Sequence, residues 1–109
     1  MTSLSPVSDA EILAFCLTIE NRMGKYFAKH YSNLTPPIVR PDSGGRKYVR
    51  IVKEDPDSGH HRSVVCFVER STGFIWKPAS WKGPTKNFSR GHIRADNPLI
   101  RITEGGCTV

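Results

Sequence analysis

Cysteine is scarce in this sequence, and its spacing excludes two classes of small protein. The chain of 109 residues holds three cysteines, Cys16, Cys66 and Cys107, which lie far apart and form no Cys-x-x-Cys pair. An odd number at such spacing argues against a disulfide framework and against a zinc knuckle. Cys16 and Cys66 stand among apolar residues, so we expect both to be small buried side chains in a reducing compartment.

Long apolar runs are also missing. No stretch approaches the roughly 20 apolar residues of a transmembrane helix, and the N-terminus lacks the basic segment and apolar run of a secretory signal. The four histidines and three cysteines show no metal-ligand spacing, so we expect no metal and no cofactor. Together these absences predict a soluble intracellular protein that makes no contact with a membrane.

What the chain does contain is a globular composition with an excess of positive charge. A hydrophobic content of 38% at this length indicates one domain over residues 1–109, with residues 1–8 and 104–109 as flexible tails. The net charge is +6, and because the charges of residues 1–33 cancel, the excess lies in residues 34–109. We therefore expect an N-terminal scaffold and a basic contact surface after it, although solubility alone also explains such a charge.

The N-terminal third has the pattern of one amphipathic helix. Ser8 and Glu11 have the spacing of a capping box at a helix start. Apolar residues then recur three and four positions apart, namely Ile12, Phe15, Cys16, Ile19, Met23, Tyr26 and Phe27. The helix should end near Tyr31, before the prolines of Thr35–Pro37. Gly24 costs about 1 kcal/mol relative to alanine, so we expect either a closely packed neighbour or a weak point there.

The middle of the chain has the composition of β-strands. Arg46–Lys53 and Arg62–Glu69 are rich in β-branched and aromatic residues, and the turn-forming cluster Asp55–Gly59 separates them. A second turn at Ser71–Gly73 precedes a third strand at Phe74–Lys77. We predict an α+β fold, in which the long N-terminal helix packs on a three- to four-stranded antiparallel meander.

Three further segments add short elements to this prediction. Pro36–Pro41 and Leu99–Thr103 can each supply an edge strand. Gly83 followed by Pro84 suits a helix start with proline at its first position, and Gly91 suits a helix end. We therefore predict a short C-terminal helical turn over Pro84–Arg90. That turn would align three cations along one side, Lys82, Lys86 and Arg90.

The segment Phe74–Arg94 bears most directly on function, and it contains no Asp or Glu. It holds both tryptophans and five cations, Lys77, Lys82, Lys86, Arg90 and Arg94. Rings on which bases can stack, next to charges that hold phosphates, are typical of a single-strand-binding surface. Alternation puts Trp76 on the same strand face as Phe74, so we expect Trp76 to pack against the helix and Trp81 to face the ligand.

The first strand carries a second candidate patch. If Val49 and Ile51 face the helix, Tyr48 and Arg50 lie together on the open side of the sheet. The predicted nucleic-acid-binding residues are Arg46, Lys47, Tyr48, Arg50, Lys77, Trp81, Lys82, Lys86, Arg90, His92 and Arg94.

Several blocks of the sequence resemble small uncharacterised proteins encoded by phages and other viruses. The blocks are Gly45–Val52, Cys66–Gly73, the Lys-Pro-Ala-Ser-Trp-Lys-Gly-Pro of Lys77–Pro84, and Arg90 with Gly91. Members of that group tend to carry an acidic residue where this chain has Arg94. The resemblance implies a viral origin and a place in the host cytoplasm, but no activity and no catalytic residues. Small basic viral proteins often bind nucleic acid, which agrees with the composition of the basic segment.

Two other classes of function stay open. His60, His61 and His92 could supply the acid and base of a small metal-independent ribonuclease, although no carboxylate is placed to orient any of them. The basic face could instead meet an acidic protein, as in a virion or host-interaction protein. DNA and RNA are equally compatible with the sequence, as are a monomer and a homodimer.

Overall fold

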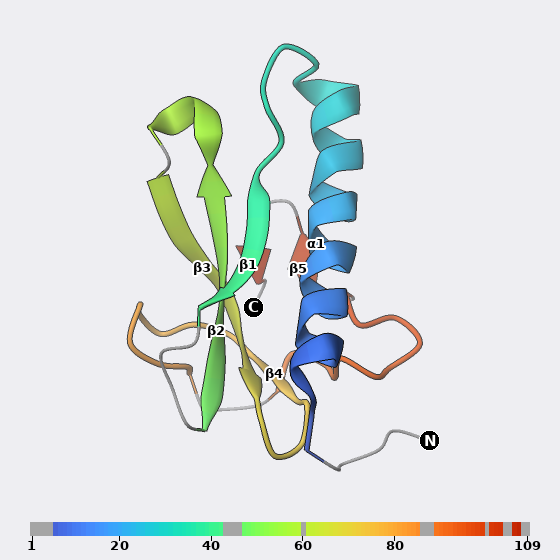
Figure 1. Cartoon of the computed structure of the whole chain (residues 1–109), viewed down its shortest axis with the longest axis vertical. Coiled ribbons are helices and arrows are strands. Elements are labelled where there is room, and N and C mark those ends of the chain that lie inside the picture. The colour runs from blue at the N-terminus through green and yellow to red at the C-terminus, as the bar shows by residue number, and fades with distance from the viewer. Residues whose placement is uncertain are drawn as a thin grey trace.

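One long helix packed on a four-stranded antiparallel sheet forms the framework of the protein (Figure 1). The computed structural model describes residues 6–42, 47–59, 61–85, 89–99, 101–103 and 106–107. In chain order the elements are α1 (Asp9–His30), β1 (Ile38–Asp42), β2 (Tyr48–Asp55), the 3-10 turn η1 (Pro56–Ser58), β3 (His61–Glu69), β4 (Ile75–Trp76), β5 (Ile102–Thr103) and β6 (Gly106–Cys107). The sheet order is β1-β2-β3-β4, so the predicted meander and α+β class are confirmed, with the edge strand from Pro36–Pro41 included.

Helix α1 begins at the predicted capping box. The Ser8 hydroxyl accepts a hydrogen bond from the Glu11 amide at 3.1 Å, and the Glu11 carboxylate accepts one from the Ser8 amide at 3.2 Å. The helix ends where the Tyr31 amide donates to the Phe27 carbonyl at 2.7 Å. Gly24 has no close neighbour, because a Cβ built there would meet nothing within 4 Å. Of the two explanations for Gly24, close packing is therefore excluded.

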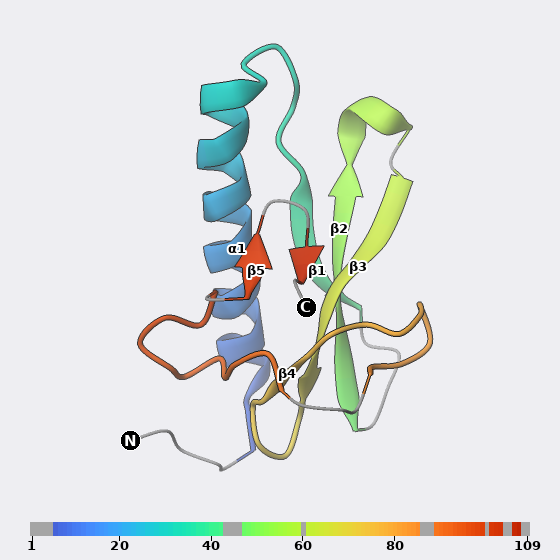
Figure 2. The same cartoon turned by 180° about the vertical axis from the view of Figure 1, so that it is seen from behind.

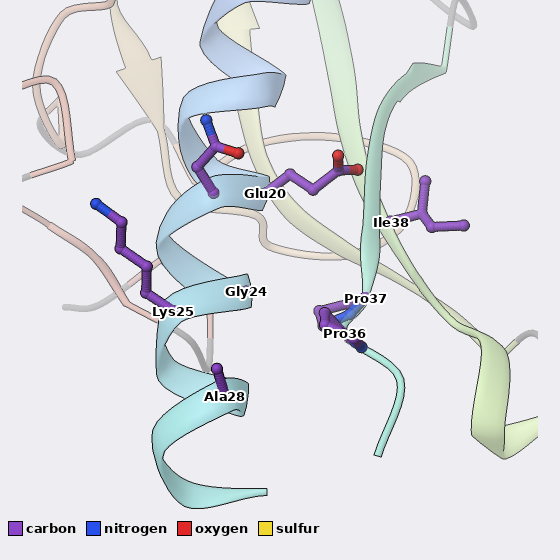
Figure 3. A pocket seen from close by; sticks show the side chains of 8 residues that line it. Glu20, Gly24, Lys25, Ala28, Pro36, Pro37 and Ile38 are labelled. Atoms are coloured by element: carbon purple, nitrogen blue, oxygen red, sulfur yellow. The ribbon is translucent and has the colours of Figure 1, made fainter. Parts of the chain in front are cut away.

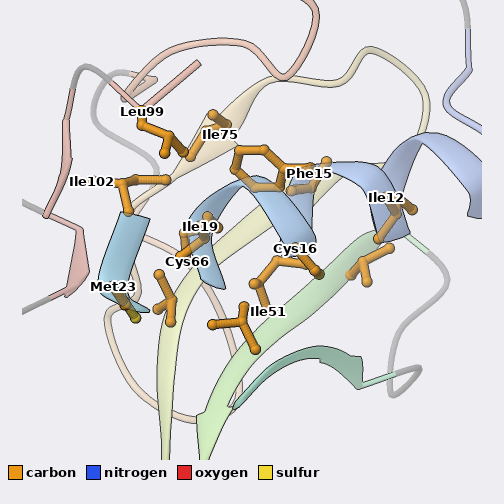
Figure 4. Close-up of a cluster of buried hydrophobic side chains, with 14 residues drawn as sticks. Ile12, Phe15, Cys16, Ile19, Met23, Ile51, Cys66, Ile75, Leu99 and Ile102 are labelled. Atoms are coloured by element: carbon orange, nitrogen blue, oxygen red, sulfur yellow. The ribbon is translucent and has the colours of Figure 1, made fainter. Parts of the chain in front are cut away.

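The core lies between α1 and one face of the sheet (Figure 4). Its helical part is the predicted stripe, with Ile12, Phe15, Cys16, Ile19 and Met23 all buried. Its sheet part comes from alternate strand positions, namely Val39, Val49, Ile51, Cys66, Val68 and Ile75. Since Val49 and Ile51 face α1, the pleat places Tyr48 and Arg50 on the opposite side, as predicted.

Trp76 does not pack against α1, and that prediction is wrong. Ile75 is the buried residue of β4, fully covered in the core and paired across the sheet with Val68. Trp76 is half-buried on the other face, where its Cα partner is Phe67. Alternation separates the two faces of such a short strand, but it does not indicate which of them meets the helix.

Strand β1 is an edge strand whose outward amide positions are blocked. The outward amide of Val39 donates to the Glu20 carboxylate of α1 at 2.9 Å. The amide positions of an edge strand alternate in direction, so Pro37, just before β1, and Pro41, within β1, occupy the outward positions on either side of Val39. Proline has no amide hydrogen to donate. This edge therefore presents few donors for pairing with another strand.

The segment between β4 and the C-terminus differs from two predictions. Pro84 bridges to Pro78, the Thr85 amide donates to the Lys77 carbonyl at 2.7 Å, and the Arg90 amide donates to the Ile75 carbonyl at 2.6 Å. The two ends of the predicted helix Pro84–Arg90 are therefore not helical, because their amides bond to β4 and to the residue after it. The centre of the predicted helix, residues 86–88, lies outside the described residues.

The predicted edge strand Leu99–Thr103 is a strand only at Ile102–Thr103. This strand, β5, pairs with β6 in a separate two-stranded sheet and does not extend the meander. Leu99 and Ile102 are buried in the core, and the short hairpin lies between α1 and β3 (Figure 2). The hairpin closes one side of the core, which gives its apolar residues a place to be buried.

Arg94 ties this C-terminal segment to the start of α1. Its Nε donates to one Glu11 oxygen at 2.6 Å and its Nη2 to the other at 2.9 Å, and Nη2 also donates to the Pro6 carbonyl at 3.0 Å. The bonds from Arg94 and from the Ser8 amide lower the pKa of the Glu11 carboxyl from its usual 4.5 to about 2.

Replacing Ile19 with alanine should destabilise the protein strongly. Ile19 is fully buried at the centre of the core, so Ile19→Ala should lower the free energy of unfolding by about 2–5 kcal/mol. Thr18 is exposed on the same helix, so Thr18→Ala should change it by no more than about 0.5 kcal/mol. Urea unfolding followed by circular dichroism measures both. Equal effects of the two substitutions would contradict the packing of α1 described above.

The Glu11–Arg94 pair should make stability depend on pH in the acid range. Because the folded state lowers the pKa of Glu11 from 4.5 to about 2, the pair contributes fully above pH 4.5. That contribution is lost as the pH falls towards 2 and Glu11 becomes protonated. The variant Glu11→Gln keeps a side chain that can serve in the capping box but has no charge, so it should lose less stability over this interval. Urea unfolding at a series of pH values tests this, and equal losses in both proteins would contradict it.

Candidate nucleic-acid interface

The face of the sheet that α1 does not cover carries aromatic and basic side chains. We call it the open face and define it by Arg40, Asp42, Tyr48, Arg50, Arg62, Phe67 and Trp76, together with Trp81, which lies against it. The strand register places the first seven on the same side, since Asp42 is opposite Arg50, and Arg50 is opposite Phe67. Cations and rings from four strands and one loop thus meet on a single surface.

A closed loop after β4 brings Trp81 to the open face. The Ala79 amide donates to the Gly83 carbonyl at 3.0 Å, and Pro78 and Pro84 bridge across the base of the loop. At its tip the Trp81 carbonyl accepts a hydrogen bond from Arg50 Nε of β2 at 2.6 Å. This loop is the orange trace that begins at β4 in Figure 1. The loop therefore holds Trp81 against the sheet through its backbone.

Two arginines lie over the Trp81 ring. The guanidinium carbon of Arg50 is 4.8 Å from the ring centroid and that of Arg62 is 5.4 Å from it, both within the range of a cation–π contact. The Asp42 carboxylate accepts from Arg50 at 3.2 Å and from Arg62 at 3.4 Å. One carboxylate therefore holds both guanidinium groups beside the indole.

The two arginines differ in how accessible they are. The Arg50 side chain is 15% exposed, is bonded to Asp42 and Trp81, and lies 5.9 Å from the Phe67 centroid. The Arg62 side chain is 49% exposed, and its contact with Asp42 is long for a charged pair. Arg50 thus serves as a fixed support for Trp81, while Arg62 can turn towards an external anion.

Arg62 and Arg40 were not predicted as part of the site. Arg62 and Phe67 are five residues apart on β3, so simple alternation puts them on opposite faces. The register shifts between Ile51 and Val52 of β2, and the extra residue in β3 brings Arg62 to the same face as Phe67. Arg40 belongs to the edge strand that was predicted, and its position opposite Val52 follows from the register alone. No pattern in the sequence marks this bulge.

The other cations predicted for the site differ in how exposed they are. Lys47 is exposed and its Nζ is 5.6 Å from the Tyr48 centroid, while the Tyr48 ring meets the Phe67 ring edge-on at 6.5 Å. Lys82 is exposed next to Trp81, and Lys77 is half-buried. Arg46 and Lys86 lie outside the described residues.

The structure does not bring three predicted residues to this surface. Arg90 is 2% exposed and His92 is 4% exposed, so the predicted accessible row of Lys82, Lys86 and Arg90 is not observed for Arg90. Arg94 is held by Glu11, as described above. The sequence showed only their charge and not their burial, so they counted as surface cations.

Both ring nitrogens of His92 are used within the fold. The Arg94 amide donates to Nδ1 at 3.1 Å, so Nε2 carries the proton and donates to the Thr72 carbonyl. Gly73, with a φ of 88°, allows this approach, because a Cβ there would lie 2.8 Å from His92 Cε1. Of the other histidines considered for catalysis, His61 is exposed at the start of β3 and His60 lies outside the described residues.

Within the described parts of the chain, no three His, Cys, Asp or Glu side chains come together as ligands for a metal ion. None of the helices in the same ranges is both long enough and apolar enough to span a bilayer. The open face also has a hollow of about 130 Å³ lined by Ile38, Arg40, Val52, Glu54 and Arg62.

Comparison with known proteins places the chain in a family. No curated protein and no solved structure matches it. The model of one family, described as a family of unknown function (DUF7717), matches residues 9–101, from the start of α1 to the residue before β5. Because this match covers well over half of the chain, the protein belongs to that family of unknown function.

Proposed function

We propose that the protein binds single-stranded nucleic acid, DNA or RNA, through the open face. The observation that carries this proposal is the position of Trp81, which is 41% exposed and lies beside two guanidinium groups on the face that α1 leaves uncovered. A base can stack on an aromatic ring of this kind whatever its identity, at about 1–3 kcal/mol per base.

The charges around Trp81 suit a phosphate backbone. Lys47, Arg62 and Lys82 are exposed cations next to the aromatic cluster, and Arg62 can exchange its long contact with Asp42 for a phosphate oxygen. The carboxylates of Asp42 and Glu54 lower the net charge of the face. Because of these carboxylates, charge alone would hold a ligand weakly. A ligand that also stacks on Trp81 is therefore favoured.

A viral origin also agrees with the sequence of the loop that carries Trp81. The resemblance of the Lys77–Pro84 block to phage and viral proteins supports a viral gene product, which would meet its nucleic acid in the host cytoplasm. Within this block, Trp81 lies against the open face, and Lys82, the next residue, is exposed.

Trp81→Ala should weaken binding of a short single-stranded oligonucleotide. The loss of one stacked base, about 1–3 kcal/mol, corresponds to a rise of roughly 5- to 150-fold in the dissociation constant. Trp81→Phe keeps a ring and should bind with intermediate affinity. Fluorescence anisotropy with a labelled oligonucleotide measures all three proteins. No binding of DNA or RNA by the native protein at about 50 mM salt would refute the proposal.

Arg62→Gln should change how strongly binding depends on salt. Each phosphate contact of a single strand contributes about 0.7 to the slope of log affinity against log salt, so losing one contact should reduce the slope by about that amount. Lys29→Gln removes an exposed cation from the last turn of α1, away from the open face, and should leave the slope unchanged. If both variants lowered the slope equally, binding would depend on overall charge and not on the open face.

A further inference from the structure

Helix α1 has an apolar outer surface that nothing in the described fold covers. Among the described residues, five large hydrophobic side chains are markedly exposed, and four of them lie on α1 or just after it: Leu13 (52%), Leu17 (56%), Tyr31 (46%) and Leu34 (47%). Leu13 and Leu17 are one turn apart and therefore point in the same direction. Adjacent exposed leucines on the outer side of a helix suit a contact with another protein.

The same helix borders a groove in its C-terminal half (Figure 3). The groove has a volume of about 550 Å³ and lies between α1 and the chain entering β1; its lining is Glu20, Asn21, Gly24, Lys25, Ala28, Pro36, Pro37 and Ile38. Gly24 and Ala28 give the helical wall little side-chain bulk, and the space beside Gly24 is open for more than 4 Å. This wall can therefore receive side chains from a partner.

The exposed leucines and the groove fit each other when two copies meet. Leu13, Leu17, Gly24 and Ala28 follow one stripe of α1, with spacings of four, seven and four residues. In an antiparallel pair of such helices Leu17 lies opposite Gly24 of the second copy, and Leu13 lies opposite Ala28. Each leucine then packs against a small residue of the other copy, and the two-fold axis repeats both contacts.

Charge favours the antiparallel arrangement as well. Residues 9–20 of α1 carry Asp9, Glu11 and Glu20 with no basic residue, whereas residues 21–30 carry Arg22, Lys25 and Lys29 with no acidic one. Within each copy Glu11 is paired with Arg94 and Glu20 accepts from the Val39 amide, so the acidic half contributes little attraction of its own. Antiparallel helices nevertheless keep the two basic halves apart and align the helix dipoles favourably. A parallel pair would place like charges together.

We propose that the protein forms a two-fold symmetric homodimer in which α1 packs antiparallel against α1 of a second copy, with Leu13 and Leu17 of each copy entering the groove beside Gly24 of the other. Pairing through β1 is the less suitable route, because Glu20, Pro37 and Pro41 block its outward amide positions. The open face is formed by the side of the sheet that α1 leaves uncovered, so the dimer leaves it accessible.

The first test is the mass of the native protein in solution. Multi-angle light scattering should give twice the chain mass of 12.2 kDa at high micromolar concentration, falling towards 12.2 kDa on dilution. A mass of 12.2 kDa over the whole concentration range would overturn the proposal.

Two variants identify the surface. Leu17→Lys removes the inserted side chain and Gly24→Gln fills the groove, and each should raise the dimer dissociation constant about tenfold or more, because each change occurs twice in the interface. Gly24→Gln also replaces a poor helix former with a good one in open space, so its melting temperature should not fall in the monomer. This variant separates loss of the dimer from loss of the fold.

The matched control is Thr18→Lys, which adds the same charge one residue along and about 100° round the helix. It should leave the dimer intact. If the native protein is dimeric and Gly24→Gln and Leu17→Lys are equally dimeric, another surface joins the copies and the proposal is wrong.

Crosslinking gives an independent geometric test. Asn21 lies near the proposed two-fold axis, so Asn21→Cys should form a disulfide between copies on mild oxidation, whereas Thr18→Cys should not. Both are made with Cys107→Ser. The native Cys16 and Cys66 are buried, and desolvation raises the pKa of Cys16 to about 12, so they do not compete. Equal crosslinking at positions 18 and 21 would contradict the antiparallel arrangement.

Discussion

The packing of α1 against one face of the sheet is the constraint on which the rest of the structure depends. Ile12, Phe15, Ile19 and Met23 are buried against alternate residues of β1 to β4, and burying a side chain of this size contributes about 1.5–3 kcal/mol. Once that face of the sheet is committed to the core, the pleat sends the intervening residues to the other side. The aromatic and basic character of the open face is therefore a consequence of which strand residues the helix covers.

The open face is held in place by polar contacts that do not belong to the core. Asp42 bonds to Arg50 and Arg62, and Arg50 bonds in turn to the Trp81 carbonyl. This network keeps a large exposed ring beside two guanidinium groups, which reduces the ordering cost when a ligand binds. The hydrogen bonds of His92 and the pairing of Arg94 with Glu11 serve the fold instead, so a basic segment of uniform appearance in the sequence divides into structural and accessible cations.

The sequence predicted the elements that have a strong local signal. The capping box at Ser8, the apolar stripe of α1 and the meander were all confirmed. The position of Tyr48 and Arg50 on the same, open face of the sheet was confirmed as well. It failed where the outcome depends on tertiary contacts. The two-residue strand β4 shows no preference for one face, so Trp76 was assigned to the wrong side. The β3 bulge, which moves Arg62 to the open face, has no local pattern. Arg90 is buried in a segment whose backbone bonds to β4, a tertiary contact that the sequence does not show.

The most direct test of nucleic-acid binding at the open face is the fluorescence of Trp81 itself. Trp76→Phe leaves Trp81 as the sole tryptophan, and the Trp76 indole nitrogen that it removes has no hydrogen-bond partner among the described residues. Titration of this variant with a short single-stranded oligonucleotide should quench the emission, because a base stacks on the indole, and added salt should reverse the quenching. Unchanged emission while anisotropy shows the oligonucleotide bound would contradict the account, since the ligand would then lie elsewhere on the protein.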